Sequence, residues 1–249
     1  MKLTLPLLCS LTLSACGGGS SPSPPAAAQP PAPAPVCNPV NVSAQGDSTM
    51  WGTQSVNGTA YQTPYNPPAL MQADLQSYLG TCVTVANDAV AGTDYGNRLF
   101  GTGNDAGLVL PQYQNWLLNN GSQVVIANFA LNDANPGNIW NETPDQFKQD
   151  MEVFVTETVA AGKFIVLEEP NPTAFEPWNT ILATYVAIID QVAAEHNIPL
   201  VQQYDYIMSL PGWQSMLIDG LHPTPALYEI KASREVAVLL PIVKTLSGN

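Results

Sequence analysis

A serine lies at the end of the first expected strand of this 249-residue chain. The apolar stretch 40–44 runs into Gly46-Asp47-Ser48-Thr49. A serine at a strand-to-helix turn presents its hydroxyl at the carboxyl edge of an α/β sheet, where ligands bind. Ser48 in that position can act as a nucleophile if a base lies beside it. Ser48 can equally well cap the N-terminus of a helix, and the local sequence fits both interpretations.

A histidine with an aspartate three residues before it lies near the C-terminal end. The stretch 219–223 reads DGLHP and precedes the last expected helix. Across a tight turn, Asp219 can reach the imidazole of His222, hold its tautomer and orient it as a base toward Ser48. By itself such a pair is equally typical of an ordinary loop aspartate and a structural histidine. With Ser48, however, it supplies all three parts that nucleophilic catalysis by serine requires.

The second histidine of the chain serves as a comparison. His196 lies at the expected C-terminal end of a helix, where a cation is mildly favoured. Nothing around it suggests chemistry, and we expect a structural or solvent-facing side chain.

Two further polar turns follow expected strands. Gly92 comes after the strand at 82–86, and Asn132 comes after the strand at 123–129. Each alone is typical of a turn. At the carboxyl edge of one sheet, however, the two can donate hydrogen bonds to a single point, as a tetrahedral oxyanion requires.

Alternating strands and helices position these turns. Such alternation is typical of a parallel α/β sheet. The expected strands are 40–44, 82–86, 123–129, 163–168 and 200–203, and the expected helices are 68–79, 110–118, 143–161, 179–196 and 225–246. The prediction is a flavodoxin-like three-layer sandwich with a five-stranded parallel sheet, in which the second strand lies beside the first.

Four sequence blocks in this order resemble those of the SGNH hydrolases, also called GDSL esterases and lipases. The blocks are Gly46-Asp47-Ser48, Gly92, Asn132 and Asp219-x-x-His222. No single block is specific, but their order and their positions at strand ends make the resemblance strong. It covers residues 37–249.

The resemblance implies a role for each of these residues. Ser48 would be the nucleophile, His222 the base and Asp219 the residue that orients the base. The oxyanion hole would consist of the backbone N–H groups of Ser48 and Gly92 and the side-chain amide of Asn132.

Two positions depart from the family pattern. The third block of the family reads Gly-x-Asn-Asp, whereas this chain has Ala130 in place of the glycine. If that position takes a positive φ, Ala130 should strain the turn and can displace Asn132. Thr49 replaces a common leucine, which we interpret as harmless. A second Gly-Asn-Asp, at 103–105, follows a polar stretch and not a strand, so we reject it.

Two cysteines lie at the starts of strands expected to be neighbours. Cys37 precedes the first strand and Cys82 begins the second. We predict a structural disulfide between them, at the end of the sheet opposite the turns; two buried free thiols are the alternative. The loop closed by this bridge would contribute about 3–4 kcal/mol.

The first 36 residues are typical of an export signal followed by a tether. Residues 1–15 resemble a signal peptide, and Leu13-Ser14-Ala15-Cys16 resembles a bacterial lipobox in which Cys16 is lipidated. Residues 16–36 then contain mainly Pro, Ala, Gly and Ser and cannot bury a core. We expect an exported, lipid-anchored protein with one hydrolase domain at 37–249; plain secretion with an incidental cysteine is the alternative.

The charge balance excludes some partners. Seven basic residues against 20 acidic ones give a formal net charge of −13, which disfavours nucleic acids and anionic membranes as partners. The only expected membrane contact is the lipid anchor. No cysteine and histidine set has zinc spacing, and we expect no metal or other cofactor.

The substrate is expected to be a small ester. Tryptophans in expected loops can line its pocket or stack on sugar rings, or they can be loop anchors and partial core: Trp51, Trp140 and Trp178. By analogy with the family, we expect a serine esterase for short-chain or acetyl esters, with acylated carbohydrates among the candidate substrates. The alternatives are a weak or inactive glycan-binding lipoprotein of the same fold and a lipase or thioesterase for longer acyl chains.

Overall fold

The computed structural model describes residues 37–103, 107–137 and 142–248. Its centre is a five-stranded parallel sheet in the order β4-β1-β5-β6-β7. The strands are β1 (Val40–Gly46), β4 (Val83–Asn87), β5 (Val124–Asn128), β6 (Phe164–Glu168) and β7 (Leu200–Val201). The second strand of the sheet along the chain therefore lies beside the first, and the flavodoxin-like prediction is confirmed.

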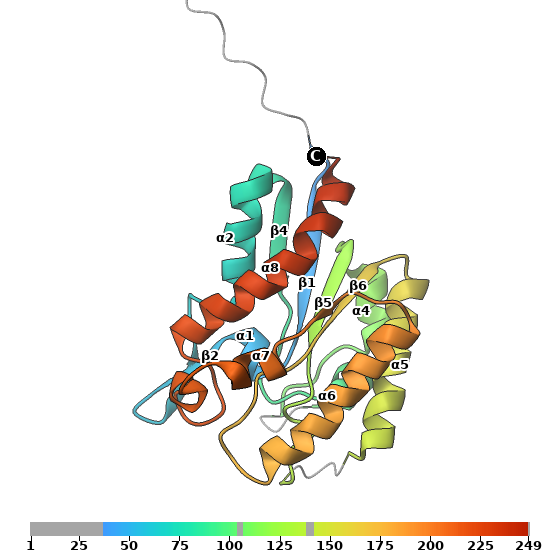
Figure 1. The fold of residues 1–249 in the computed structure, drawn as a ribbon. Coiled ribbons are helices and arrows are strands. Elements are labelled where there is room, and N and C mark those ends of the chain that lie inside the picture. Colours follow the sequence, from blue (N-terminus) through green and yellow to red (C-terminus); the bar gives the residue numbers. More distant parts are fainter. Residues whose placement is uncertain (1–36, 104–106, 138–141, 249) are drawn as a thin grey trace, which may run out of the picture. The chain divides into compact units, whose positions relative to one another are not determined.

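Helices cover both faces of the sheet (Figure 1). On one face lie α2 (Pro67–Leu79) and α8 (Pro225–Ser247), and on the other lie α3 (Tyr95–Phe100), α4 (Tyr113–Asn119), α5 (Pro144–Ala160) and α6 (Trp178–Glu195). The short helices are α1 (Ser48–Trp51), α7 (Tyr204–Ser209), η1 (Gly80–Cys82) and η2 (Trp213–Met216). The expected helices are all present and differ from the prediction only at their ends. For α5, the predicted start is confirmed: Thr143 is the N-cap, and its side chain accepts a hydrogen bond of 3.2 Å from the N–H of Gln146.

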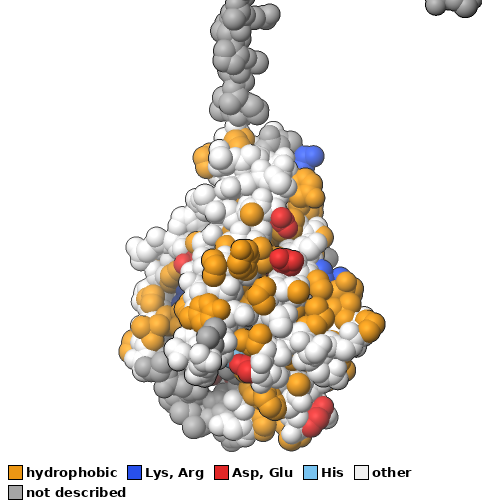
Figure 2. Space-filling model, turned by 90° about the vertical axis from the view of Figure 1, so that its left-hand side faces the viewer, with side chains coloured by type: hydrophobic (Ala, Val, Ile, Leu, Met, Phe, Trp, Pro, Cys, Tyr) orange, Lys and Arg blue, Asp and Glu red, His pale blue; other side chains and the backbone are white. Residues whose placement is uncertain are grey.

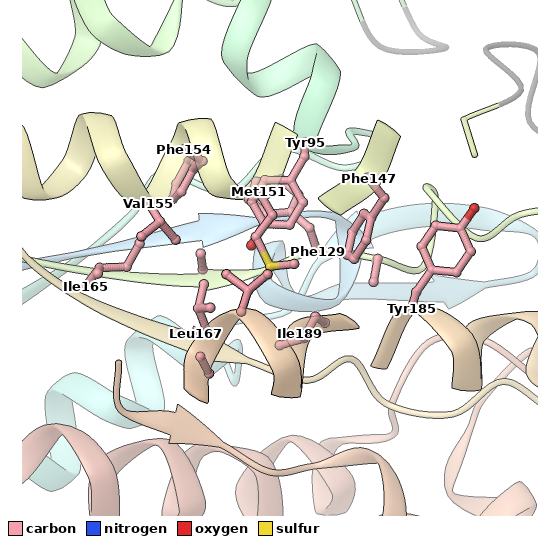
Figure 3. Packing of buried hydrophobic residues seen from close by; sticks show 14 of the residues in the cluster. Tyr95, Phe129, Phe147, Met151, Phe154, Val155, Ile165, Leu167, Tyr185 and Ile189 are labelled. Carbon is pink, nitrogen blue, oxygen red and sulfur yellow. The ribbon is translucent and has the colours of Figure 1, made fainter. Parts of the chain in front are cut away.

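The sheet is apolar on both sides, as a strand sequence such as that of β5 requires. Val124 and Ile126 pack toward α2 and α8, whereas Val125 and Ala127 pack toward α5 and α6. Figure 3 shows the second of these layers, where aromatic rings from several helices meet above the sheet. This packing on two faces fixes the positions of the strand ends and of the turns that follow them.

A β-hairpin of β2 (Thr53–Val56) and β3 (Thr59–Gln62) was not predicted. Its turn is Asn57-Gly58, and both residues have positive φ, 51° and 76°. Asn-Gly is the strongest short-range hairpin signal, so the sequence did carry the information. The hydroxyl of Tyr228 on α8 donates a 3.0 Å hydrogen bond to the carbonyl of Thr53 at the base of the hairpin.

The predicted disulfide is confirmed. Cys37 and Cys82 are bonded, with a Cα–Cα distance of 6.0 Å, at the starts of the adjacent strands β1 and β4. The backbone N–H of Asn38 donates to the carbonyl of Ser247 in the same region, so this end of the sheet also holds the end of α8. The turn that carries Ser48 follows the other end of β1.

Several predictions fall on residues outside the described ranges. They are the signal peptide, the lipidation of Cys16, the linker, and the Asn104-Asp105 part of the rejected Gly-Asn-Asp stretch. None of the helices in the described ranges is both long and apolar enough to cross a membrane.

Figure 2 shows the face on the left of Figure 1, where apolar side chains form several separate groups among polar uncharged ones, with few charged side chains.

Candidate active site

The turn after β1 places Ser48 at the first position of α1. Asp47, not Ser48, is the N-cap: its Oδ1 accepts hydrogen bonds from the backbone N–H and the hydroxyl of Thr49, at 2.8 and 2.9 Å. The interpretation of Ser48 as a helix cap is therefore wrong. Because Asp47 performs the capping, the Ser48 hydroxyl is available for another partner.

The glycine of this turn is required by close packing. A Cβ on Gly46 would lie 2.7 Å from the Cβ of Met50 and would also collide with the carbonyl oxygen of Asn128. The N–H of Asp47 donates to that same carbonyl at 3.2 Å. The turn can therefore pass this close to β5 only with glycine at position 46.

Ser48, His222 and Asp219 form one chain of hydrogen bonds. The Oγ of Ser48 lies 2.9 Å from Nε2 of His222, and Nδ1 of His222 lies 2.8 Å from Oδ2 of Asp219. A carboxylate can only accept, so Nδ1 carries the proton and Nε2 accepts from the serine hydroxyl. The structure thus brings the three predicted residues together in the arrangement that activates a serine.

Asp219 is held in its ionised form. Its Oδ1 accepts hydrogen bonds from the backbone N–H groups of Leu221 and His222, at 3.0 and 2.8 Å. Partial burial favours the neutral acid, but these hydrogen bonds and the one from the His222 ring outweigh it, and the pKa of Asp219 is lowered. A negative charge therefore faces the imidazole and stabilises it once it is protonated.

The two turns predicted to hold an oxyanion are linked to each other. Gly92 has a positive φ of 77°. The side-chain amide of Asn132 donates a 2.8 Å hydrogen bond to the carbonyl of Thr93, the residue after Gly92. The hydroxyl of Thr93 lies 3.3 Å from the carbonyl of Gly46, and the N–H of Val90 donates to that carbonyl at 2.9 Å. The turns after β1, β4 and β5 therefore form one connected region at the carboxyl edge of the sheet.

The expected strain at Ala130 is present. Its φ is 97°, in the region that favours glycine. The side chain of Asp133 compensates: Oδ2 accepts from the N–H of Ala130 at 2.8 Å, and Oδ1 accepts from the N–H of Tyr95 at 3.0 Å. Asn132 keeps its bond to Thr93 in this turn. The substitution therefore strains the backbone without separating the two turns.

Thr49 makes buried hydrogen bonds in the turn that carries Ser48. Its side chain is fully buried, and its hydroxyl lies 3.0 Å from Oδ1 of Asn128 in addition to its bond with Asp47. The amide of Asn128 in turn donates to the carbonyl of Glu169 at 2.9 Å. The hydroxyl of Thr49 therefore joins the turn that carries Ser48 to β5, which a leucine side chain could not do.

The predicted pocket aromatics have different surroundings. Trp51 is half-buried and packs against the core beneath α2 and α8. Trp178 is also half-buried; its Nε1 donates a 3.0 Å hydrogen bond to the carbonyl of Leu131, and its ring is stacked with that of Phe175. Trp140 lies outside the described residues. Phe175, half-exposed, is an aromatic residue of this region that the sequence did not single out.

The comparison histidine behaves as expected. His196 is the exposed C-cap residue of α6. Across residues 37–103, 107–137 and 142–248, no three His, Cys, Asp or Glu side chains are grouped so that they could hold a metal ion.

Solved structures share this fold. A lipase/acylhydrolase from Enterococcus faecalis has a TM-score of 0.65 at 22% identity, with 82% of this chain and 96% of that chain covered. An aryl esterase from M. smegmatis has 0.63 at 16%, covering 83% and 99%. A catalytic mutant of Axe2, an acetylxylan esterase from Geobacillus stearothermophilus, has 0.61 at 18%, covering 81% and 94%.

Sequence similarity identifies the family directly. Among curated proteins, none is similar enough to this chain to count as a match. The sequence profile of the GDSL-like Lipase/Acylhydrolase family, in contrast, matches residues 44–230, more than half of the chain. That range contains Ser48, Gly92, Asn132, Asp219 and His222. This protein belongs to the GDSL-like lipase/acylhydrolase family.

Proposed function

We propose that the protein is a serine esterase that hydrolyses carboxylic esters through an acyl-enzyme. The observation that carries this proposal is the hydrogen-bond chain from Ser48 Oγ through His222 to Asp219, at 2.9 and 2.8 Å. His222 takes the hydroxyl proton as Ser48 Oγ attacks the ester carbonyl. The tetrahedral intermediate then collapses, and His222 gives the proton to the departing alcohol. Water attacks the acyl-serine with the same base, releasing the acid and restoring the hydroxyl.

The charge of the intermediate is stabilised by three donors in this proposal. They are the backbone N–H groups of Ser48 and Gly92 and the side-chain amide of Asn132. The hydrogen bond from Asn132 to Thr93 supports this assignment, because it fixes the plane of the amide beside the Gly92 turn. Donors that are already oriented need no rearrangement when the negative charge develops.

We propose short acyl esters, acetyl esters in particular, as substrates, and an acylated carbohydrate as their natural form. An open site supports this choice: the side chains of Asp219 and His222 are 40% and 15% exposed. One of the similar structures is an acetylxylan esterase. The half-exposed ring of Phe175, stacked on Trp178, offers a flat apolar surface beside the His222 turn.

A binding protein without catalysis is the second candidate, and Ala130 is the observation in its favour. Its positive φ strains the turn that carries Asn132. If the turn moved, one oxyanion donor would be lost, which typically lowers the rate by about 10²–10³-fold. A lipase or thioesterase for longer acyl chains would use the same residues.

Hydrolysis of p-nitrophenyl acetate tests the proposal. We expect Ser48→Ala and His222→Ala to lower kcat by about 10⁴-fold or more. His196→Ala is the matched control, because it removes the other histidine from an exposed position, and it should leave the rate unchanged. Equal background rates for the parent protein and Ser48→Ala would favour the binding protein. A series of esters from acetyl to dodecanoyl separates short-chain from long-chain preference.

We also propose that the protein is exported and lipid-anchored through Cys16, with residues 17–36 as a spacer. The sequence of residues 1–36 supports this. Cys16→Ser should then release the protein from the membrane fraction in its host cell, whereas an unchanged distribution would favour plain secretion or retention by another route.

A further inference from the structure

The segment after β6 contacts the turn that carries His222. We call residues 171–178 the bracket; it follows β6 closely and ends at the first residue of α6. Asn171 and Thr173 in it are almost fully buried, although they are polar and lie in a loop. Buried polar side chains in a loop normally have specific partners, and here the partners belong to the candidate active site.

The bracket binds the carbonyl groups of the two residues that separate Asp219 from His222. The hydroxyl of Thr173 and the N–H of Ala174 both donate to the carbonyl of Gly220, at 3.0 and 2.7 Å. The side-chain amide of Asn171 donates to the carbonyl of Leu221 at 3.0 Å. Both residues between the acid and the base are therefore held from outside the turn.

The hydrogen bonds from the bracket have an effect that the hydrogen bonds within the His222 turn do not have. Asp219 accepts hydrogen bonds from Leu221 and His222, which fix the geometry within the turn. They do not fix the position of the turn relative to the sheet. The bracket follows β6, an interior strand of the sheet, so its hydrogen bonds tie the turn to the same sheet whose strand β1 leads into Ser48.

The other end of the bracket contacts the turn that carries Asn132. Nε1 of Trp178 donates a 3.0 Å hydrogen bond to the carbonyl of Leu131, the residue before Asn132. The ring of Trp178 stacks on Phe175 with centroids 6.4 Å apart and an interplanar angle of 18°. Phe175 in turn lies against Gly220, where a Cβ would be 2.8 Å from its Cζ. One short segment therefore contacts both the His222 turn and the Asn132 turn.

We propose that the bracket positions the two halves of the active site relative to each other, with Thr173 and Asn171 as positioning residues for His222 and Trp178 as the positioning residue for Asn132. This inference rests on the proposed esterase function. None of the three touches the reacting atoms. Their effect is to keep Nε2 of His222 within hydrogen-bond reach of Ser48 Oγ while the oxyanion donors keep their place, because small misplacements of reacting groups lower rates strongly.

Thr173 offers the sharpest test, because valine keeps the branched shape of its side chain and serine keeps its hydroxyl. Thr173→Val removes the hydroxyl, which donates to the carbonyl of Gly220 and accepts from the N–H of Phe175 at 3.3 Å, and Thr173→Ser keeps it. With p-nitrophenyl acetate, we expect Thr173→Val to lower kcat by about 10–100-fold with KM within about twofold. Thr173→Ser should stay within about threefold of the parent protein. Thr245→Val is the control, since this exposed threonine lies outside the bracket, on α8, and its hydroxyl donates to the carbonyl of Pro241.

Trp178→Phe tests the other end, because it keeps an aromatic ring and removes the N–H that binds Leu131. A lower kcat with unchanged KM is expected here as well. Equal kcat for the parent protein, Thr173→Val and Trp178→Phe would overturn the proposal. So would losses in kcat that Thr173→Ser shares with Thr173→Val, since the hydroxyl would then not matter.

A spectroscopic measurement separates failure of the bracket from failure of the esterase assignment. The proton between His222 Nδ1 and Asp219 lies in a short, charge-assisted hydrogen bond and should resonate far downfield in the proton NMR spectrum. The signal should be present in the parent protein and in Thr173→Ser. In Thr173→Val it should be lost or broadened, while the other resonances remain those of a folded protein. An unchanged signal in Thr173→Val would overturn the bracket even if no esterase activity were found. Absence of Ser48-dependent hydrolysis would overturn the proposed function alone.

Discussion

The carboxylate of Asp133 accepts a 2.8 Å hydrogen bond from the backbone N–H of Ala130, whose φ is 97°. The same carboxylate accepts from the N–H of Tyr95 at the start of α3. One buried acid therefore connects the turn after β5 with the helix that follows the Gly92 turn. This connection explains how a non-glycine residue keeps a conformation that glycine adopts more easily.

Ala130→Gly should stabilise the protein. Strain at a positive φ costs about 1–3 kcal/mol, and the extra freedom of glycine in the unfolded chain offsets part of the gain, so we expect about 1 kcal/mol in the free energy of unfolding. Urea denaturation measures it. Ala127→Gly is the control, because Ala127 is equally buried in β5 but has no positive φ. This variant should be less stable than the parent protein. Equal losses in both variants would contradict the strain argument.

The stability of the protein should fall as the pH rises through neutrality. Burial raises the pKa of Asp133 to about 7, with the Asp94 carboxylate adding to the effect, and burial also raises the pKa of Glu142. A raised pKa means that the folded protein holds protons that the unfolded chain releases above about pH 4. The contribution of these protonated acids is therefore complete below about pH 4. That of Asp133 declines as the pH rises toward 7, and that of Glu142, whose pKa is raised to about 10, continues to decline above neutrality.

Glu142→Gln tests this dependence, because glutamine resembles the protonated acid and does not titrate. The fall in the free energy of unfolding between pH 4 and pH 7 should become shallower in this variant. Glu152→Gln on α5, whose side chain is 38% exposed and paired with Lys148, should keep the slope of the parent protein. Identical slopes in all three proteins would show that Glu142 does not contribute.

The sequence was sufficient for the parts of the site that are local in the chain. Asp219 and His222 lie three residues apart, and Ser48 directly follows a strand, so a turn and a sheet edge were enough to bring them together. The blocks at Gly92 and Asn132 follow strands in the same way. The strand order followed from the alternation of strands and helices, which restricts a parallel sheet to few topologies.

The bracket was not predicted, because its residues act through contacts distant in the sequence. Thr173 and Gly220 are 47 positions apart, and nothing in the stretch 171–178 indicates which carbonyls it meets. The contact between Thr49 and Asn128 was not predicted for the same reason, because the two residues are 79 positions apart. Side-chain to backbone bonds of this kind leave no periodic pattern, unlike the apolar faces of helices and strands.

Removing the disulfide should affect stability and not catalysis. Cys37 and Cys82 are separated by 45 positions, and on the chain-entropy estimate the bridge contributes about 3–4 kcal/mol. We expect Cys37→Ser/Cys82→Ser to lose about that amount in urea denaturation. Because the bridge lies at the starts of β1 and β4, kcat at 25 °C should stay within about twofold of the parent value, provided that the variant is folded. A large loss of kcat in the folded variant would mean that the bridge also shapes the site.

Gly220→Ala should damage the site through a specific collision. Gly220 has a φ of 83°, and a Cβ there would lie 2.8 Å from Cζ of Phe175. Gly212 has a similar φ of 69°, but a Cβ there would meet only the Ser215 hydroxyl, at 3.7 Å. Both alanine variants should lose about 1 kcal/mol of stability to backbone strain. Only Gly220→Ala should also lose kcat, by about tenfold, because either the ring or the turn that carries His222 has to move.

A double-mutant cycle with Phe175→Ala separates the collision from the strain. If the ring displaces the turn, the double variant Gly220→Ala/Phe175→Ala should have a kcat close to that of Phe175→Ala, because the new Cβ then has room. The loss of stability from the positive φ should remain, as in Gly212→Ala. If the double variant is as slow as the sum of the two single changes predicts, the ring is not the obstacle. The His222 turn would then depend on the backbone conformation of Gly220 itself, held by the hydrogen bonds that its carbonyl accepts from Thr173 and Ala174.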